Sequence, residues 1–207
     1  VHGLRFARDS IGFRALNRPP PFHSRLTWTN PTLADEVLDR VAQDLNLDGF
    51  GIKDSFSQLE LEGFGLRCIF DASWIWCDAA TSTALPHWKV IETEEDLLAW
   101  ESAWKVGGSP SDLRQFPAAI LNRPDVCIWG REGEQGFDAG CIANLSENCV
   151  GLSNAFGSDV FPAATQLTLD FGKGRPLVGY ERDADLENAK RAGCESVGPL
   201  NVWIKPT

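Results

Sequence analysis

Residues 176–207 restrict the possible fold more than any other part of the chain, because they read as a strand, a short helix and a second strand. An apolar run precedes Glu181, and the helix-forming segment after it is followed by Gly193, a residue typical of helix ends. Residues 197–204 have the composition of a strand. A strand that enters a sheet after a helical crossover runs parallel to a neighbour. The tail therefore predicts a sheet with some parallel pairing and a helix on its face.

The segment before this tail predicts further strands and two helices. Short apolar runs separated by polar turns are typical of an antiparallel meander, and they occupy residues 126–130, 139–145 and 149–156. A helix is expected over 159–171, with Asp159 as its cap and Pro162 in its first turn. Thr93, followed by three acids, predicts the start of another helix that runs to about Lys105. Together these elements predict an α/β or α+β fold with a mixed, mostly antiparallel sheet and flanking helices.

The first half of the chain predicts a separate lobe. Residues 1–31 read as loop, a helix is expected over 33–45, and strands are expected over 50–56 and 68–77. The small, polar residues 78–87 form the best candidate linker. We therefore expect an N-terminal accessory lobe over 1–85 and a second domain over 86–207.

The two halves also end alike. Residues 41–77 and 165–204 each run from a helix end through a strand to a second strand that closes on Trp-Ile. One interpretation is a degenerate half-repeat, in which the accessory lobe is related to the second domain. The other is that any strand–helix–strand segment has this appearance.

Composition and charge exclude several classes of function. The net charge of −10 and the pI of about 4.7 argue against a nucleic-acid partner, which needs a basic face. No apolar run approaches the length of a membrane span, and the basic N-terminal residues precede no apolar core of a secretory signal. The six cysteines have no C-x-x-C spacing and none of the three histidines lies near a pair, so no metal site is expected. Buried free thiols in a reducing cytoplasm are the expectation.

From about Trp88 onward the order of elements resembles the GNAT acetyltransferase superfamily. Residues 176–181 are similar to that family's fifth strand, and residues 185–194 are similar to its fourth helix and the Gly-Phe after it, with Cys194 replacing Phe. Residues 139–144 and 150–156 are similar to its third and fourth strands.

The resemblance implies acetyl-CoA as cosubstrate, bound where the fourth and fifth strands splay apart. The positions that it implies as cofactor contacts end the fourth strand and open the next helix: Leu152, Ser153, Asn154, Phe156, Gly157 and Ser158. The pyrophosphate would meet backbone N–H groups at that helix start, where the helix dipole favours anions. The expected partners are therefore an acyl-CoA and a small-molecule amine.

The chain departs from the family pattern at two places. The loop 154–160 has one glycine and an acid where the family has a basic or amide residue and two glycines. The family's usual general-acid tyrosine aligns with Ala189.

These departures leave two functions open. The first is N-acetyl transfer to an unidentified amine by direct attack on the thioester, with Glu181 as base and Tyr180 as an acid or substrate contact. The alternative is a catalytically degenerate fold that binds a small ligand or a partner.

Overall fold

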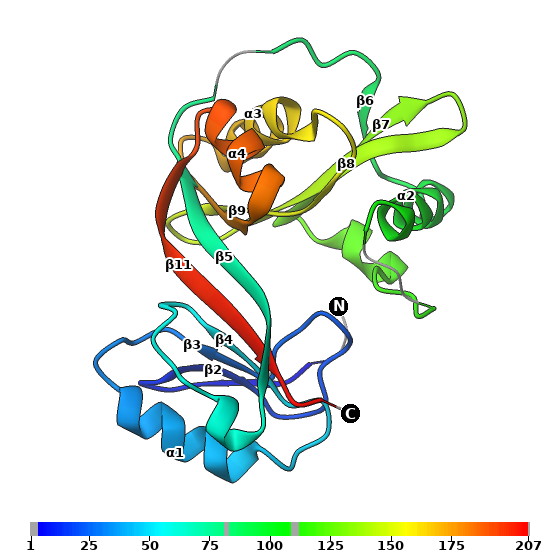
Figure 1. Cartoon of the computed structure of the whole chain (residues 1–207). Coiled ribbons are helices and arrows are strands. Elements are labelled where there is room, and N and C mark those ends of the chain that lie inside the picture. The colour runs from blue at the N-terminus through cyan, green and yellow to red at the C-terminus, as the bar shows by residue number, and fades with distance from the viewer. Residues whose placement is uncertain (1–3, 81–82, 109–111, 207) are drawn as a thin grey trace. The chain divides into compact units, whose positions relative to one another are not determined.

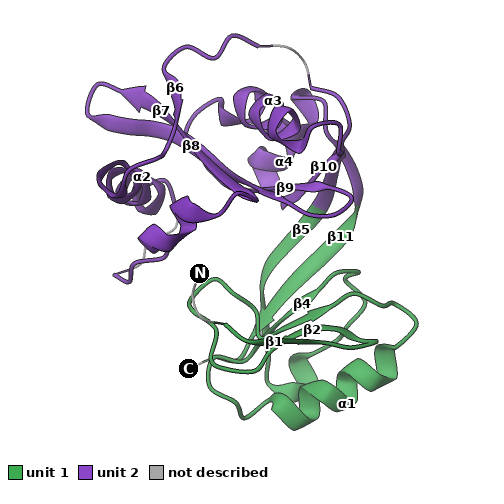
Figure 2. Cartoon of the chain, turned by 180° about the vertical axis from the view of Figure 1, so that it is seen from behind, with its two compact units in different colours: residues 1–73, 198–207 green, residues 74–197 purple. Residues whose placement is uncertain are grey.

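The computed structural model describes residues 4–80, 83–108 and 112–206, which form two compact units (Figures 1 and 2). Unit 1 comprises residues 1–73 and 198–207, and unit 2 comprises residues 74–197. The chain passes between the units within two long strands, β5 (Arg67–Cys77) and β11 (Glu195–Ile204). Unit 1 is therefore built from two separate stretches of sequence.

The sheet of unit 2 is an antiparallel meander extended by one parallel strand. Its order is β6-β7-β8-β9-β10-β5, and only β9 and β10 pair in parallel among its registered pairs. The parallel pair is joined by helix α3, as a crossover connection requires. This confirms the mixed, mostly antiparallel sheet that the sequence predicts. The strands not yet given bounds are β6 (Trp88–Val90), β7 (Val126–Gly133), β8 (Gly136–Leu145), β9 (Val150–Phe156) and β10 (Leu177–Glu181).

Helices cover both faces of this sheet. On one face, α3 (Val160–Gly172) and α4 (Asp183–Arg191) bury an apolar core against strand residues such as Leu152 and Leu177. On the other face, α2 (Glu94–Val106) packs on β7 and β8, where Trp100 is fully buried. The Thr93 hydroxyl accepts a hydrogen bond from the Asp96 backbone N–H at 3.1 Å, so the expected cap of α2 is confirmed.

Trp100 anchors α2 on the sheet, and its indole ring fills space that is open because residue 140 is glycine. Its indole Nε1 donates to the carbonyl of Trp129 at 2.8 Å. A side chain at Gly140 would begin 2.2 Å from the same indole nitrogen, so only glycine fits beneath the ring. The indole therefore has both a packing site and a hydrogen-bond partner, which is what a buried tryptophan needs.

Unit 1 repeats the meander and the crossover on a smaller scale. Strands β1 (Phe6–Arg8), β2 (Gly12–Ala15) and β3 (Leu26–Trp28) are antiparallel, and α1 (Ala34–Asp44) leads to β4 (Gly51–Asp54), which is parallel to β3. Strand β11 pairs antiparallel with the other side of β4. Helix α1 packs its apolar face on these strands around Trp28 and Ile52. The order meander, helix, parallel strand is thus common to both units.

The expectation of loop over residues 1–31 is wrong, because this segment supplies β1, β2 and β3. Each of these strands has only three or four residues. Their partners are set by long-range pairing, which a local pattern does not reveal. The short helical turn η2 (Ala118–Asn122) was also not anticipated.

The compact units do not follow the expected division at residues 85 and 86. The boundary between the two units lies between residues 73 and 74, inside β5, and the last ten residues belong to unit 1. The proposed linker 78–87 has no helix or strand among its described residues, although the backbone N–H of Thr83 donates to Gln166 of α3 at 2.7 Å.

Candidate functional site

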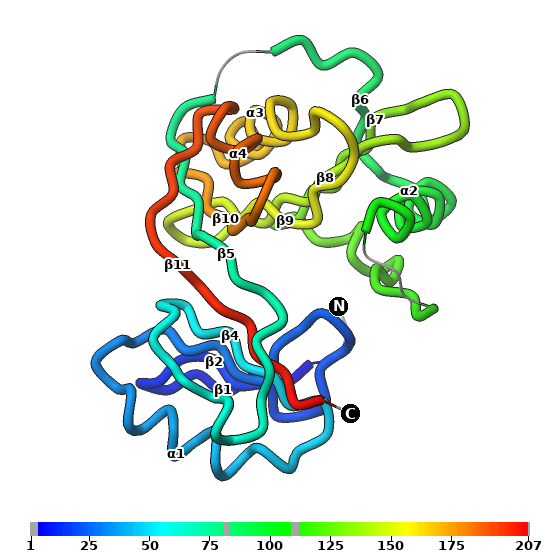
Figure 3. The backbone as a smooth tube through the Cα atoms, in the orientation of Figure 1, coloured from blue at the N-terminus to red at the C-terminus, as the bar shows by residue number. Residues whose placement is uncertain are grey.

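Strands β9 and β10 begin as neighbours and then separate. Figure 3 shows the two strands next to each other, and their ladder has two registered pairs, Leu177 with Val150 and Val178 with Gly151. A side chain at Gly179 would begin 3.0 Å from the carbonyl oxygen of Leu152, so the strands are still close one residue further on. The rest of β9, as far as Phe156, has no registered partner in β10. The diverging ends leave strand-edge backbone groups available to a ligand.

A bulge in β9 lies beside this divergence. In the ladder with β8, Ser153 opposes Ile142 and Phe156 opposes Gly140, so Asn154 and Ala155 together face one residue. Asn154 has a φ of 53°, in the left-handed region that asparagine tolerates better than most residues. Its side-chain amide donates to the Ser153 hydroxyl at 3.0 Å. Within the described strands, neither Asn154 nor Ala155 has a registered partner.

The loop after β9 leads into the N-terminus of α3. Gly157 has a φ of 96°, and a side chain there would begin 2.3 Å from the carbonyl oxygen of Asp138. Glycine is therefore required both for the turn and for close packing on β8. Asp159 occupies the N-cap position with a φ of 52° but makes no capping hydrogen bond, so the expected cap is wrong. The helix start lacks a side-chain cap, and its first N–H groups are available to an anion.

Arg131 of β7 reaches this loop, a contact that sequence reasoning missed. Its Nε donates to Asp138 at 2.6 Å, and its Nη2 donates to the carbonyl of Ser158 at 3.3 Å. The Arg131 side chain is a quarter exposed. It therefore places positive charge at the loop whose own sequence supplies only an acid. No local motif predicts this, because the contact joins residues 27 positions apart.

Glu181 ends β10 in a setting that opposes its ionisation. Burial, together with the negative charge of Asp185, raises the pKa of the Glu181 carboxyl to about 8. Among the described residues, its carboxylate makes no hydrogen bond or ion pair. The thiol of Cys194 is near enough for the charge on Glu181 to contribute to the raised pKa of that thiol. A carboxyl whose pKa is moved close to neutrality by burial is a candidate proton carrier.

Tyr180 is adjacent to Glu181 in sequence but faces the other side of the sheet. Leu177 packs in the core beneath α3 and α4, so alternation turns Tyr180 away from those helices. Its ring meets Trp74 of β5 edge to face, with centroids 5.5 Å apart and planes at 85°. Two candidate groups thus stand at one strand end, on opposite faces.

Several predicted residues have side chains in the core. Leu152 packs under α3, and the ring of Phe156 packs edge to face against Trp100 with centroids 5.2 Å apart. Both side chains are therefore buried in the core and do not face a ligand. They remain candidates for cofactor contact through their backbones alone. Ser153 and Asn154 are half-buried on β9, and Gly157 and Ser158 are exposed. Ala189, at the family's usual acid position, is fully buried.

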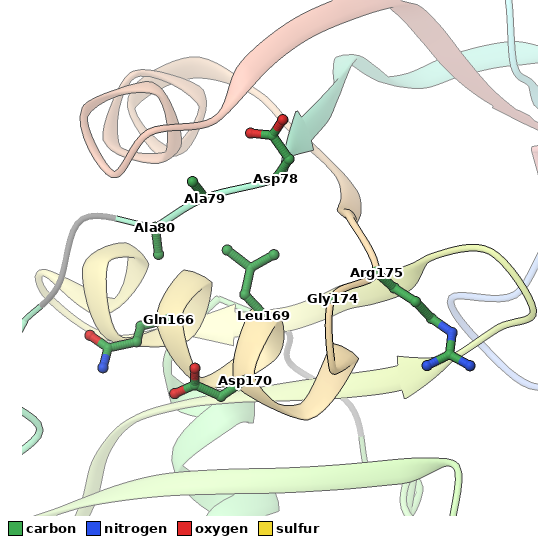
Figure 4. A pocket seen from close by; sticks show the side chains of 8 residues that line it. All are labelled: Asp78, Ala79, Ala80, Gln166, Leu169, Asp170, Gly174 and Arg175. Carbon is green, nitrogen blue, oxygen red and sulfur yellow. The ribbon is translucent and has the colours of Figure 1, made fainter.

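A cavity of about 390 Å³ lies away from the diverging strands. It is lined by residues 78–80 and by α3 and the loop after it, where Leu169 points toward the 78–80 segment (Figure 4). Its charged residues are Asp78, Asp170 and Arg175, and the Arg175 guanidinium is held by the carbonyls of Glu147 and Gly172. None of the predicted site residues lines it.

In the described part of the chain, no helix is long and apolar enough to cross a membrane. Over the same residues, no group of three or more His, Cys, Asp or Glu side chains is placed to hold a metal ion. All six cysteines are free thiols, and burial raises the pKa of Cys77 and of Cys194.

Comparison with solved structures identifies the fold. A GCN5-related N-acetyltransferase from Kribbella flavida superposes with a TM-score of 0.63 at 10% identity, over 99% of this chain and 90% of that one. A putative GNAT-family acetyltransferase from Novosphingobium aromaticivorans gives 0.58 at 13% identity, over 92% and 88% of the two chains. A functionally unknown conserved protein from Staphylococcus epidermidis gives 0.64 at 10% identity, over 99% and 95%.

The chain therefore has the GNAT acyltransferase fold, as its sequence resemblance predicts. The similarity extends over nearly the whole chain, so it includes both units and not residues 86–207 alone. No protein-family model matches the sequence. No curated protein matches it either.

Proposed function

We propose that this protein is a divergent GNAT enzyme that transfers an acetyl group from acetyl-CoA to an amine. One observation carries the proposal: the ladder between β9 and β10 ends after Gly151 and Val178, so the strand ends diverge. The equivalent parallel pair of unit 1 does not diverge, since all three residues of β3 pair with β4 as far as Trp28 and Asp54. This difference between the two parallel pairs supports a thioester site in unit 2 and not in unit 1.

The residues around the divergence fit the two ends of acetyl-CoA. The uncapped start of α3, with Arg131 beside it, suits the pyrophosphate, because backbone N–H groups and a guanidinium both bind phosphate oxygens. The unpaired backbone of Asn154 and Ala155 suits the acyl end, because an N–H aimed at the carbonyl oxygen stabilises the negative charge that develops there. Acetyl-CoA itself supplies the activated thioester.

Glu181 and Tyr180 are the proposed proton carriers. An amine is protonated in water and must lose a proton to become a nucleophile. The Glu181 carboxylate accepts that proton, through water, once the pH exceeds its raised pKa of about 8. The Tyr180 hydroxyl, at the same strand end, is the candidate donor to the departing thiolate. A base whose pKa lies near the working pH is ionised in a sizeable fraction of the molecules and is still basic enough to take a proton from the amine.

A second function is favoured by two specific residues. Ala189 is a buried methyl where the family's usual acid stands, and the exposed Asp159 places a negative charge at the pyrophosphate loop. Both are consistent with a GNAT-like fold that binds a small ligand or a partner without catalysis. The two functions differ in whether acetyl-CoA is consumed.

Thermal unfolding with and without acetyl-CoA tests the proposal. A ligand that binds only the folded state stabilises it by about 2.7 kcal/mol at one hundred times its Kd, so the Tm should rise with acetyl-CoA concentration. Desulfo-CoA serves as a control that binds without reacting, and free CoA release in the presence of an amine panel reports turnover. An unchanged Tm at millimolar acetyl-CoA contradicts the proposal. A raised Tm with no CoA release supports the binding module instead.

A further inference from the structure

Three aromatic rings gather on one face of the sheet beside the diverging strands. On β5, Ile75 and Cys77 pack into the core under α3 and α4, so Trp74 and Trp76 face the other way. On β10 the same alternation places Tyr180 on the face that carries these two tryptophans, and the contact between Tyr180 and Trp74 agrees with it. Trp76 is 39% exposed. We call Trp74, Trp76 and Tyr180 the aromatic wall.

The wall is not part of the core of unit 2. Its residues are absent from the core beneath α3 and α4 and from the core beneath α2, which both lie within the described residues of this unit. The rings of Trp74 and Tyr180 meet edge to face with their planes at 85°, so the faces of the two rings point in perpendicular directions. A corner of perpendicular aromatic faces is the arrangement by which proteins hold ammonium groups, because the face of each ring carries partial negative charge.

The charges around the wall favour a cation over an anion. Asp183 and Asp185 lie in the first turn of α4, which follows the strand of Tyr180 directly. The one basic residue among them, Arg182, lies 3.7 Å from the carboxylate of Asp183. The whole chain carries a net charge of −10. The negative electrostatic potential of these groups raises the local concentration of cationic ligands near the strand end.

We propose that the acceptor is an amine with a second, non-reacting cationic group, and that the aromatic wall holds this group. The assignment rests on the proposed acetyl transfer at the diverging strands, next to which the wall lies. The held cation is not the reacting nitrogen, because that nitrogen must be neutral to attack. Diamines, and amines that carry a quaternary ammonium or guanidinium group, have the required chemistry.

Binding of choline tests the wall without any reaction at nitrogen. Choline is titrated against its neutral isostere 3,3-dimethylbutan-1-ol in the presence of CoA, and the indole N–H signals of the folded full chain are followed by NMR. Signals of Trp74 and Trp76, assigned with Trp74→Phe and Trp76→Phe, should shift and saturate with choline. The neutral isostere should bind about five- to thirty-fold more weakly, the range expected for loss of a cation–π contact.

Two variants make the test specific. Trp76→Leu should weaken choline binding by a similar factor, whereas Trp88→Leu, a half-buried tryptophan in the edge strand β6, should leave it unchanged. In turnover assays, butane-1,4-diamine should have a lower KM than butylamine with the wild type, and Trp76→Leu should remove the difference. The proposal is overturned if choline and the isostere bind alike, if no signal saturates, or if Trp88→Leu matches Trp76→Leu.

The acetyl-CoA Tm shift is read separately on the same proteins. Trp76→Leu should retain the full shift, because Trp76 lies on β5, outside the residues proposed to contact acetyl-CoA. Loss of the shift in the wild type refutes acetyl transfer, whatever choline does. A normal shift with no choline preference refutes the wall alone.

Discussion

Val178 lies opposite Gly151, and this is the last registered pair of the parallel ladder between β9 and β10. Three residues past Gly151, the ladder of β9 with β8 reaches its bulge, so backbone groups on both edges of β9 lack strand partners within a few residues. In unit 1, by contrast, Asp54 directs its carboxylate to the backbone N–H groups of Phe56, Gln58 and Leu59. The end of β4 is therefore occupied by the backbone of the segment that follows it. We propose that the corresponding end of β10 receives a ligand.

Removal of the Arg131 guanidinium should weaken acetyl-CoA binding. The charge-assisted contact with phosphate is partly exposed, so we expect Arg131→Ala to raise the Kd about five-fold, equivalent to about 1 kcal/mol. The Tm shift at a fixed acetyl-CoA concentration should fall accordingly. Arg123→Ala is the matched control, because Arg123 makes a similar ion pair with Asp125 within the short segment before β7. An equal loss in both variants would contradict a specific role for Arg131.

The rate of acetyl transfer should follow the ionisation of Glu181. Because the carboxylate is the active form of the base, kcat/KM should rise with pH and level off above about 8, the raised pKa of this residue. Glu181→Gln should lower kcat by about 10²- to 10⁴-fold and remove this dependence. A wild-type profile that stays flat between pH 6 and 9, or a Gln variant of normal rate, would exclude Glu181 as the base.

Glu181 should also affect stability, with a definite sign. Its pKa is raised from 4.5 to about 8 on folding, so the folded state holds a proton that the unfolded state releases between these values. The free energy of unfolding should therefore fall across this window, and the loss should be complete above about pH 8. Glu181→Gln should stabilise the protein at pH 9 by on the order of 1–3 kcal/mol and have little effect below pH 4.5. Urea unfolding at the two pH values measures the difference.

Gly157 should be far less tolerant of a side chain than another glycine with a similar backbone. Gly157→Ala combines a positive φ with a clash against the Asp138 carbonyl, and should cost about 2 kcal/mol or more. Gly174→Ala shares the positive φ, at 86°, but meets nothing within 4 Å, so it should cost only about 1 kcal/mol. Denaturant midpoints of the two variants isolate the steric part. Equal losses would mean that the loop does not pack on β8 as described.

Trp100 should be a principal anchor of α2. Trp100→Phe removes the hydrogen bond to the Trp129 carbonyl and leaves space above Gly140, so we expect a loss of about 2–4 kcal/mol. Leu98→Ala on the same helix is the control, since Leu98 is 46% exposed and should change stability by about 0.5 kcal/mol or less. The readout is urea unfolding, followed by far-ultraviolet circular dichroism.

Local sequence patterns predicted the helices and most strands of unit 2. Capping at Thr93, the turn residues of the meander and the glycine after α4 all act within a few residues. Strands β1, β2 and β3 escaped detection because three-residue strands have too few side chains to show alternation.

The candidate site combines positions that the sequence could propose with contacts that it could not. The positions of Glu181 and of the loop 156–158 follow from chain order, so resemblance could propose them, and their roles stay predictions. The bulge at Asn154 depends on how β9 registers with β8, and the contact of Arg131 with Ser158 depends on tertiary folding. The raised pKa of Glu181 depends on burial, which one strand does not reveal.

The pairing of β4 with β11 has a consequence for biosynthesis. Lys205 donates to the carbonyl of Leu45, a residue 160 positions earlier, and Trp203 pairs with Ile52 in the same region. A ribosome that makes the chain from its N-terminus releases β4 long before β11 exists. Throughout that interval the edge of β4 has no strand to pair with, and exposed edges of this kind recruit other chains. The nascent protein should accordingly depend on chaperones until its last strand emerges, and should refold slowly in vitro, because so much of its pairing is non-local.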